Sequence, residues 1–160
     1  MKKTQKRLGN KGFSLVELIV VIAIMAVLVG VLAPTLIKNV EKSRESTDVQ
    51  NLDSMRGAVV TMLSNEKNYD ALVPTSGNVT YTVSFTSSGC TITAGTGAPS
   101  TFATSSGNLQ TELFETVGEF KAKSKKAKEG TIQFTVSNLG KVSATFAGAK
   151  PKYVDSFTIE

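Results

Sequence analysis

The twenty residues from Leu18 to Ile37 carry no formal charge, and this stretch most constrains how the chain can fold. As an α-helix rising about 1.5 Å per residue, it would be about 30 Å long, the hydrocarbon thickness of a bilayer. A chain of 160 residues has little material to cover every face of such a helix in a soluble core. The stretch therefore favours a membrane-spanning helix over a buried core helix.

The charge of the chain is unevenly distributed around this stretch. Residues 1–12 carry no acid and five basic residues: Lys2, Lys3, Lys6, Arg7 and Lys11. The other 148 residues carry 13 basic and 13 acidic residues, so the net charge of +5 belongs to the first twelve. Basic residues before a span predict that the N-terminus stays in the cytoplasm and that the rest faces outside. A secretory signal peptide fits less well, because its apolar core is usually about 7–15 residues long and ends at a small-residue cleavage site.

A helical pattern continues beyond the apolar stretch. Apolar residues recur at steps of three and four, which is one helical face, at Val49, Leu52, Met55, Val59 and Met62 or Leu63. The stripe extends backwards weakly through Thr47 and Val40. We predict one helix from about Phe13 to about Asn65, bent where Pro34 removes a backbone donor.

The pairs Glu41–Arg44 and Lys42–Glu45 are spaced three residues apart on this helix. Oppositely charged residues at this spacing are neighbours on an exposed helical surface. We therefore expect this part of the helix to be solvated.

The rest of the chain reads mainly as short strands. Alternation of apolar and polar residues predicts strands at 79–85, 90–94, 132–136 and 142–146, with a weaker last strand within 153–159. A break is expected at 68–77 and a loop at 95–107, followed by a second helix with Asn108 as its N-cap. The fold class is α+β: a long N-terminal helix whose apolar stripe covers one face of an antiparallel sheet.

The most informative residues precede the apolar stretch: Gly12, Phe13 and Glu17. Glu17 could be an interfacial carboxylate that reaches the lipid headgroups. If the bond after Gly12 is cut, Phe13 carries a new ammonium one helical turn from Glu17. At about 4 Å such a pair interacts by about 4 kcal/mol at an effective dielectric near 20. The pair could form within one chain, or between two chains, where it would fix their axial register.

Lys11-Gly12-Phe13-Ser14-Leu15-Val16-Glu17 resembles the prepilin cleavage motif of type IV pilins and pseudopilins, and the resemblance is close over residues 7–45, including Pro34. It implies that a membrane aspartic prepilin peptidase cuts after Gly12 and methylates the amine of Phe13, and that Glu17 is the assembly residue. It also implies that pilus assembly machinery builds mature chains into a helical homo-oligomeric filament, with the apolar helices inside and β-rich bodies outside.

The organisation expected from pattern and resemblance together has four parts. They are a cleaved basic leader (1–12), the transmembrane and filament-core half of the helix (13–37), its amphipathic half (38–66) and a C-terminal β-rich globular region (67–160). The precursor is expected as a single-pass protein of the inner or cytoplasmic membrane, and the assembled pilus is extracellular.

The composition offers few side chains that could act in catalysis. Histidine is absent and Cys90 is the one cysteine, so His-based mechanisms and an internal disulfide are excluded. We expect no enzyme activity, no cofactor and no metal. Cys90 reads as a small buried hydrophobe or as half of an intermolecular disulfide. Lys121, Lys125 and Lys128 would share a helical face, either solvated or in contact with nucleic acid.

The function that these expectations favour is a structural subunit of a type IV pilus, for adhesion, surface motility or biofilm formation. A pseudopilin of a secretion or DNA-uptake system is the alternative, and an uncleaved membrane-anchored binding domain is a third. Processing separates the third from the other two, and filament length separates the first two.

Overall fold

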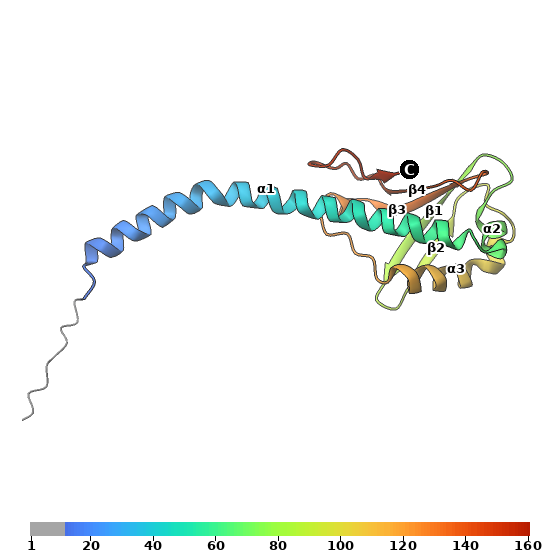
Figure 1. Cartoon of the computed structure of the whole chain (residues 1–160), viewed down its shortest axis with the longest axis horizontal. Coiled ribbons are helices and arrows are strands. Elements are labelled where there is room, and N and C mark those ends of the chain that lie inside the picture. The colour runs from blue at the N-terminus through green and yellow to red at the C-terminus, as the bar shows by residue number, and fades with distance from the viewer. Residues whose placement is uncertain (1–11) are drawn as a thin grey trace, which may run out of the picture. The chain divides into compact units, whose positions relative to one another are not determined.

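The computed structural model describes residues 12–160 of the chain. Its internal contacts divide the chain into two compact units, Met1–Asn39 and Val40–Glu160. Helix α1 (Leu15–Met62) begins in the first unit and ends in the second (Figure 1). The prediction of one long N-terminal helix is therefore confirmed, and α1 continues through Pro34.

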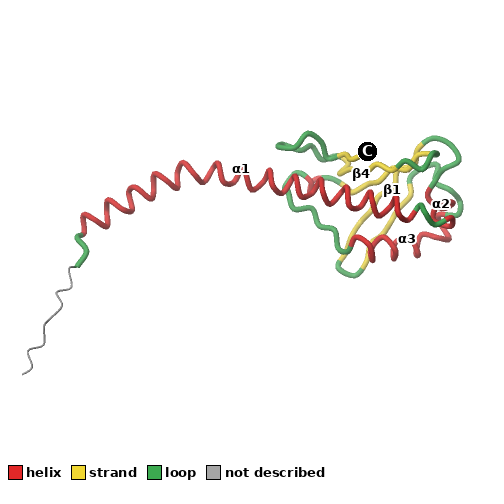
Figure 2. Tube along the Cα trace, in the orientation of Figure 1, coloured by secondary structure: helices red, strands yellow, loops and turns green. Residues whose placement is uncertain are grey.

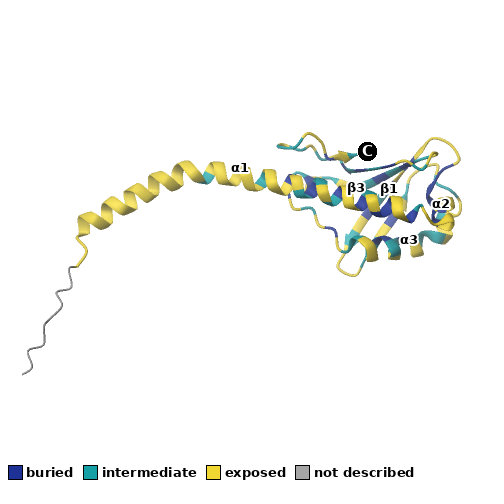
Figure 3. Ribbon diagram, in the orientation of Figure 1, coloured by how far each residue is buried: buried dark blue, intermediate teal, exposed yellow. Residues whose placement is uncertain are grey.

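The two parts of α1 differ in burial. In the first unit every described side chain is exposed except that of Ala33, which is half-buried (Figure 3). In the second unit one face is buried, and its apolar members recur every three or four residues: Leu52, Met55, Val59 and Met62. This apolar part of the stripe was predicted. The weak extension through Thr47 and Val40 was wrong, because Val40 is exposed and Thr47 only half-buried.

The sheet has five antiparallel strands in the order β2-β1-β3-β4-β5. Figure 2 draws the strands in yellow. The strands are β1 (Asn78–Thr86), β2 (Gly89–Ala94), β3 (Thr131–Ser137), β4 (Val142–Ala147) and β5 (Thr158–Ile159). The four main strands coincide with the predicted ones, because successive side chains of a strand point to opposite faces and leave a readable alternation.

One face of the sheet is apolar and the other is rich in threonine. The buried side chains of the apolar face include Tyr81, Phe134 and Phe146, which share one core with the buried stripe of α1. On the other face Thr80 and Thr135 lie 3.0 Å apart between hydroxyl oxygens on adjacent strands. The α+β fold, with a helix over one face of an antiparallel sheet, is therefore the predicted one.

Two shorter helices depart from the prediction. Helix α2 (Glu66–Leu72) occupies part of the expected break. The side chain of Asn65 caps it by accepting the N–H of Lys67 at 3.0 Å. The buried Asn68 then donates to Glu112 of the next helix at 2.8 Å. The predicted break was therefore wrong, because the Asn65 cap and the distant hydrogen bond to Glu112 together stabilise this short helix.

Helix α3 (Phe102–Val117) begins earlier than expected, so Asn108 is not its N-cap. Its first turns are rich in Ser, Thr and Gly, which are poor helix formers and favoured a loop. Leu109 and Leu113 of this helix are fully buried in the core, and that tertiary packing overrides the local preference. Gly118, at φ 72°, ends the helix.

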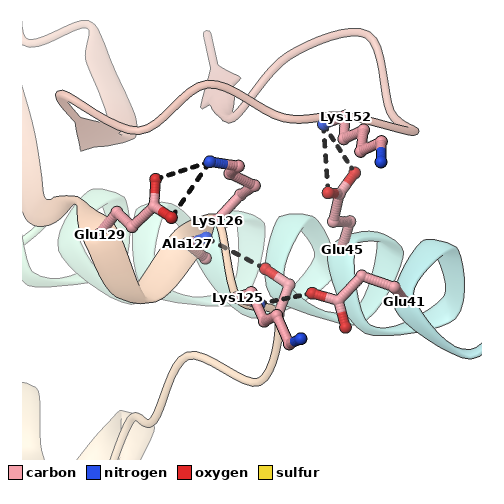
Figure 4. Close-up of polar contacts among 8 residues, drawn as sticks. Glu41, Glu45, Lys125, Lys126, Ala127, Glu129 and Lys152 are labelled. Atoms are coloured by element: carbon pink, nitrogen blue, oxygen red, sulfur yellow. Dashed lines mark hydrogen bonds and ion pairs between the residues drawn. The ribbon is translucent and has the colours of Figure 1, made fainter.

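Glu45 is a buried carboxylate, and the expected surface pair with Lys42 was wrong. The side chain is 0% exposed and accepts three backbone N–H groups of one C-terminal segment. The first donor is Lys152, at 3.1 and 3.2 Å (Figure 4). The other two are Tyr153 at 2.7 Å and Val154 at 3.2 Å. The pair Glu41–Arg44 is present, with 3.4 Å between its charged atoms.

Two more carboxylates of α1 bind the segment between α3 and β3. Asp48, also 0% exposed, accepts the N–H groups of Lys123 at 2.8 Å and Ser124 at 2.7 Å. Glu41 accepts the N–H of Lys125 (Figure 4). Backbone donors that belong to no strand are thus satisfied by side chains of α1, as buried polar groups require.

Candidate processing and assembly site

The residues around the expected cleavage point lie at the start of the described chain. Gly12, Phe13 and Ser14 precede α1, and all three are exposed, with Phe13 87% exposed. A Cβ at position 12 would meet no atom within 4 Å in the described structure. The Gly12–Phe13 bond therefore lies in an exposed stretch of the described chain. Residues 1–11 of the expected leader lie outside the described residues.

Glu17 caps the helix on which it lies. Its Oε2 atom accepts the backbone N–H of Ser14 at 2.9 Å, and the Oγ atom of Ser14 accepts the N–H of Val16 at 3.3 Å. This arrangement is close to a capping box, in which a serine before the helix and a glutamate three residues later satisfy free backbone donors. The Ser-x-x-Glu spacing is visible in the sequence, but this cap was not predicted from it.

The negative charge of Glu17 also suits the positive end of the α1 dipole. Within residues 12–160, Oε1 of Glu17 makes no recorded hydrogen bond or ion pair, so one carboxylate oxygen is left to accept a second donor. Phe13 lies four residues before Glu17 in the sequence and is bonded to Ser14, whose N–H Glu17 accepts. A donor created at Phe13 would therefore arise close to this carboxylate.

The part of α1 that follows is long and apolar enough to cross a membrane. Its side chains are exposed all around the helix in the described chain, including Ile24, Val27 and Leu28. An apolar surface of this size needs lipid or protein to cover it. Glu17 is the one charged residue in its first turn.

The other predicted candidates do not form a site of the expected kind. Lys121, Lys125 and Lys128 share no helical face, because α3 ends at Val117 and only a short 3₁₀ turn, Ala127–Glu129, follows. Cys90 is half-buried against the core and its Sγ donates to the carbonyl of Gln110 at 3.0 Å. Burial raises the pKa of the Cys90 thiol, in keeping with a small packed side chain.

Comparison with known proteins bears on this same N-terminal segment. Residues 7–33 match the family model of the prokaryotic N-terminal methylation motif, the signature of type IV pilins and pseudopilins. No curated protein and no solved structure matched the chain. The match covers 27 of the 160 residues; it supports a type IV pilin or pseudopilin as the class of protein and suits a membrane-anchored precursor.

Proposed function

We propose that the chain is a structural subunit of an extracellular type IV pilus that serves adhesion, surface motility or biofilm formation. One observation carries the proposal: an exposed Gly12–Phe13 bond lies a few residues before Glu17, at the start of an exposed apolar helix whose first part lies within the match to the methylation motif. Prepilin peptidase would cut after Gly12 and methylate the amine of Phe13. The second unit supplies a compact β-rich body.

Glu17 is the proposed assembly residue. Its Oε2 atom holds the N–H of Ser14, while Oε1 is available to the Phe13 ammonium of a neighbouring chain. Among closely packed apolar helices, every register that leaves this ammonium unpaired is costly, because a buried charge without a partner costs about 3–5 kcal/mol. Glu17 would therefore set the axial offset between subunits. Pro34 would bend the helix within the filament core.

Mass spectrometry of native surface material tests the processing step. The expected N-terminus is a methylated Phe13, and residues 1–12 should be missing. Material that starts at Met1 in surface filaments would contradict the proposal and favour an uncleaved membrane-anchored binding domain.

Glu17→Ala tests the assembly step. We expect normal membrane insertion and cleavage but loss of filaments, because the penalty of about 3–5 kcal/mol recurs at each subunit added. Glu17→Gln should be intermediate at best, since an amide accepts a hydrogen bond without neutralising an ammonium. The readout is filament yield beside a blot for processed protein.

Ser14→Ala is the matched control for this experiment. It removes the serine side chain of the helix cap, which costs about 0.5–2 kcal/mol, and keeps the charge of Glu17. Filaments should therefore persist. If Ser14→Ala abolishes filaments as completely as Glu17→Ala, then the cap and not the intermolecular pair explains Glu17. The methylation motif is shared with pseudopilins, so the length of the filaments separates that alternative.

A further inference from the structure

Three lysines are gathered around the beginning of the second unit by the carboxylates of α1. Glu41, Glu45 and Asp48 accept the backbone N–H groups of Lys125, Lys152 and Lys123, respectively. The side chains of these lysines are not used in these bonds, as Figure 4 shows for Lys125 and Lys152. Lys42 lies on the same segment of α1. In the described part of the chain none of the four makes a recorded ion pair, so their ammonium groups are available to a partner.

These four lysines, Lys42, Lys123, Lys125 and Lys152, are called the basic collar. The segments that hold them, residues 40–48, 121–129 and 150–152, contain nine basic and four acidic residues, a net charge of +5. The whole second unit has twelve of each, so its other residues sum to −5. Two of the four acids in the collar segments, Glu45 and Asp48, are fully buried. The second unit is therefore electrically polarised, with its positive charge beside residues 41–48 of α1.

Chain connectivity keeps the collar close to the membrane. Glu41 follows Ile37, the last residue of the apolar stretch, by four residues. Four residues span about 6 Å as a helix and about 14 Å when fully extended. The headgroup layer adds about 5–8 Å beyond the hydrocarbon on each side, and a surface charge acts over about 10 Å at 0.1 M salt. Chain connectivity alone thus places the Glu41 end of the collar within reach of the lipid headgroups, and Asp48, eleven residues after Ile37, follows about 17 Å along the helix.

We infer that the basic collar binds anionic lipid headgroups at the outer surface of the membrane that the precursor spans. The inference rests on the membrane-anchored precursor of the proposed function but not on filament assembly. Acidic residues near α2, among them Glu66, Asp70 and Glu112, lie about 20 residues or more further along the chain from the collar segment of α1. An anionic bilayer repels those acidic residues and attracts the basic collar, so the collar is the surface that should face the membrane. Each lysine near such a surface contributes about fivefold to its association.

A single-tryptophan quenching experiment tests the inference on the full chain. The chain has no tryptophan, so Tyr153→Trp places one probe beside Lys152, whose Nζ atom lies 5.3 Å from the ring of Tyr153. Tyr69→Trp on α2 is the distant probe. The probes are reconstituted in vesicles with a nitroxide on some headgroups, made of phosphatidylcholine alone or mixed with phosphatidylglycerol, at low and high sodium chloride.

The expected result is stronger quenching of the probe at position 153 in vesicles with phosphatidylglycerol, reversed by salt, and no lipid dependence for the probe at position 69. Adding Lys125→Gln and Lys152→Gln should weaken the docked state by about fivefold per lysine. The fold should survive, because Glu41 and Glu45 are bound by backbone N–H groups. Lys67→Gln with Lys141→Gln is the matched control and should change nothing.

Two results would overturn the inference. One is that the chain remains in the vesicles after an alkaline wash, yet quenching at position 153 does not depend on phosphatidylglycerol. The other is that the chain binds duplex DNA, that the two collar substitutions abolish this binding, and that quenching at position 153 is equal in vesicles with and without phosphatidylglycerol. That result would make the collar a nucleic-acid surface. A chain that the alkaline wash removes contradicts the membrane-anchored precursor itself, and so the proposed function.

Discussion

Replacing Glu45 by alanine separates two explanations of why an acid stands at this position. If Glu45 and Lys42 formed a surface pair, either substitution would cost about 0.5 kcal/mol or less. The structure instead buries Glu45 and directs three backbone N–H groups of residues 152–154 at its carboxylate. Glu45→Ala should therefore be far more damaging than Lys42→Ala.

The magnitude follows from these bonds. A hydrogen bond to a charged group contributes about 1.5–3 kcal/mol, and a buried donor without a partner costs about 1–3 kcal/mol. The three donors should regain some hydration, because Lys152 is exposed and Tyr153 and Val154 are half-buried. We therefore expect Glu45→Ala to lower the free energy of unfolding by about 3–5 kcal/mol in total. Glu45→Gln keeps one acceptor oxygen and should cost about half as much.

The assay is urea unfolding of a chain that begins at Lys38, followed by circular dichroism. This chain omits the exposed apolar part of α1 and keeps every residue of the core, so we expect it to be soluble and monomeric. A lower midpoint at an unchanged slope reports lost stability. Equal and small effects of Glu45→Ala and Lys42→Ala would refute the buried-acceptor explanation.

Two further predictions concern the core. Burial raises the pKa of Tyr81 from 10.0 to about 12. The stability that this group contributes is therefore fully present below pH 10, and about 2.7 kcal/mol of it should be lost as pH rises through 12. Tyr81→Phe should remove that dependence, and a tyrosinate absorbance titration of both chains checks it; a Tyr81 that titrates near pH 10 contradicts it. Gly95→Ala would place a Cβ atom 2.7 Å from the carbonyl oxygen of Thr80 and should cost about 1–3 kcal/mol. Gly107→Ala on α3, with open space around it, should instead stabilise by about 0.5–1 kcal/mol in the same urea assay.

The strands and the long helix could be predicted from the sequence because each leaves a local periodic pattern. Val79, Tyr81 and Val83 alternate with polar residues, and the structure buries all three. The start of α3 could not be predicted in this way, because its stability depends on Leu109 and Leu113 reaching the core rather than on the Ser-rich and Thr-rich turn before them. The cap formed by Ser14 and Glu17 was a local signal, and it could have been found from spacing alone.

The role of Glu45 was beyond local sequence patterns because its donors lie 107 to 109 residues further along the chain. The face of α1 that meets the rest of the second unit has a regular spacing that hydrophobicity alone conceals. The half-buried Glu41 and the buried Glu45, Asp48, Leu52, Met55, Val59 and Met62 follow one another at alternating steps of four and three. Where this face meets side chains of the sheet it is apolar. Where it meets the unpaired backbone N–H groups of residues 123–125 and 152–154 it is acidic, since a buried donor requires an acceptor. The same helical face therefore stabilises the sheet with its apolar half and two loops with its acidic half. Because these bonds use backbone N–H groups, the side chains of Lys123, Lys125 and Lys152 are left without an ion pair within residues 12–160.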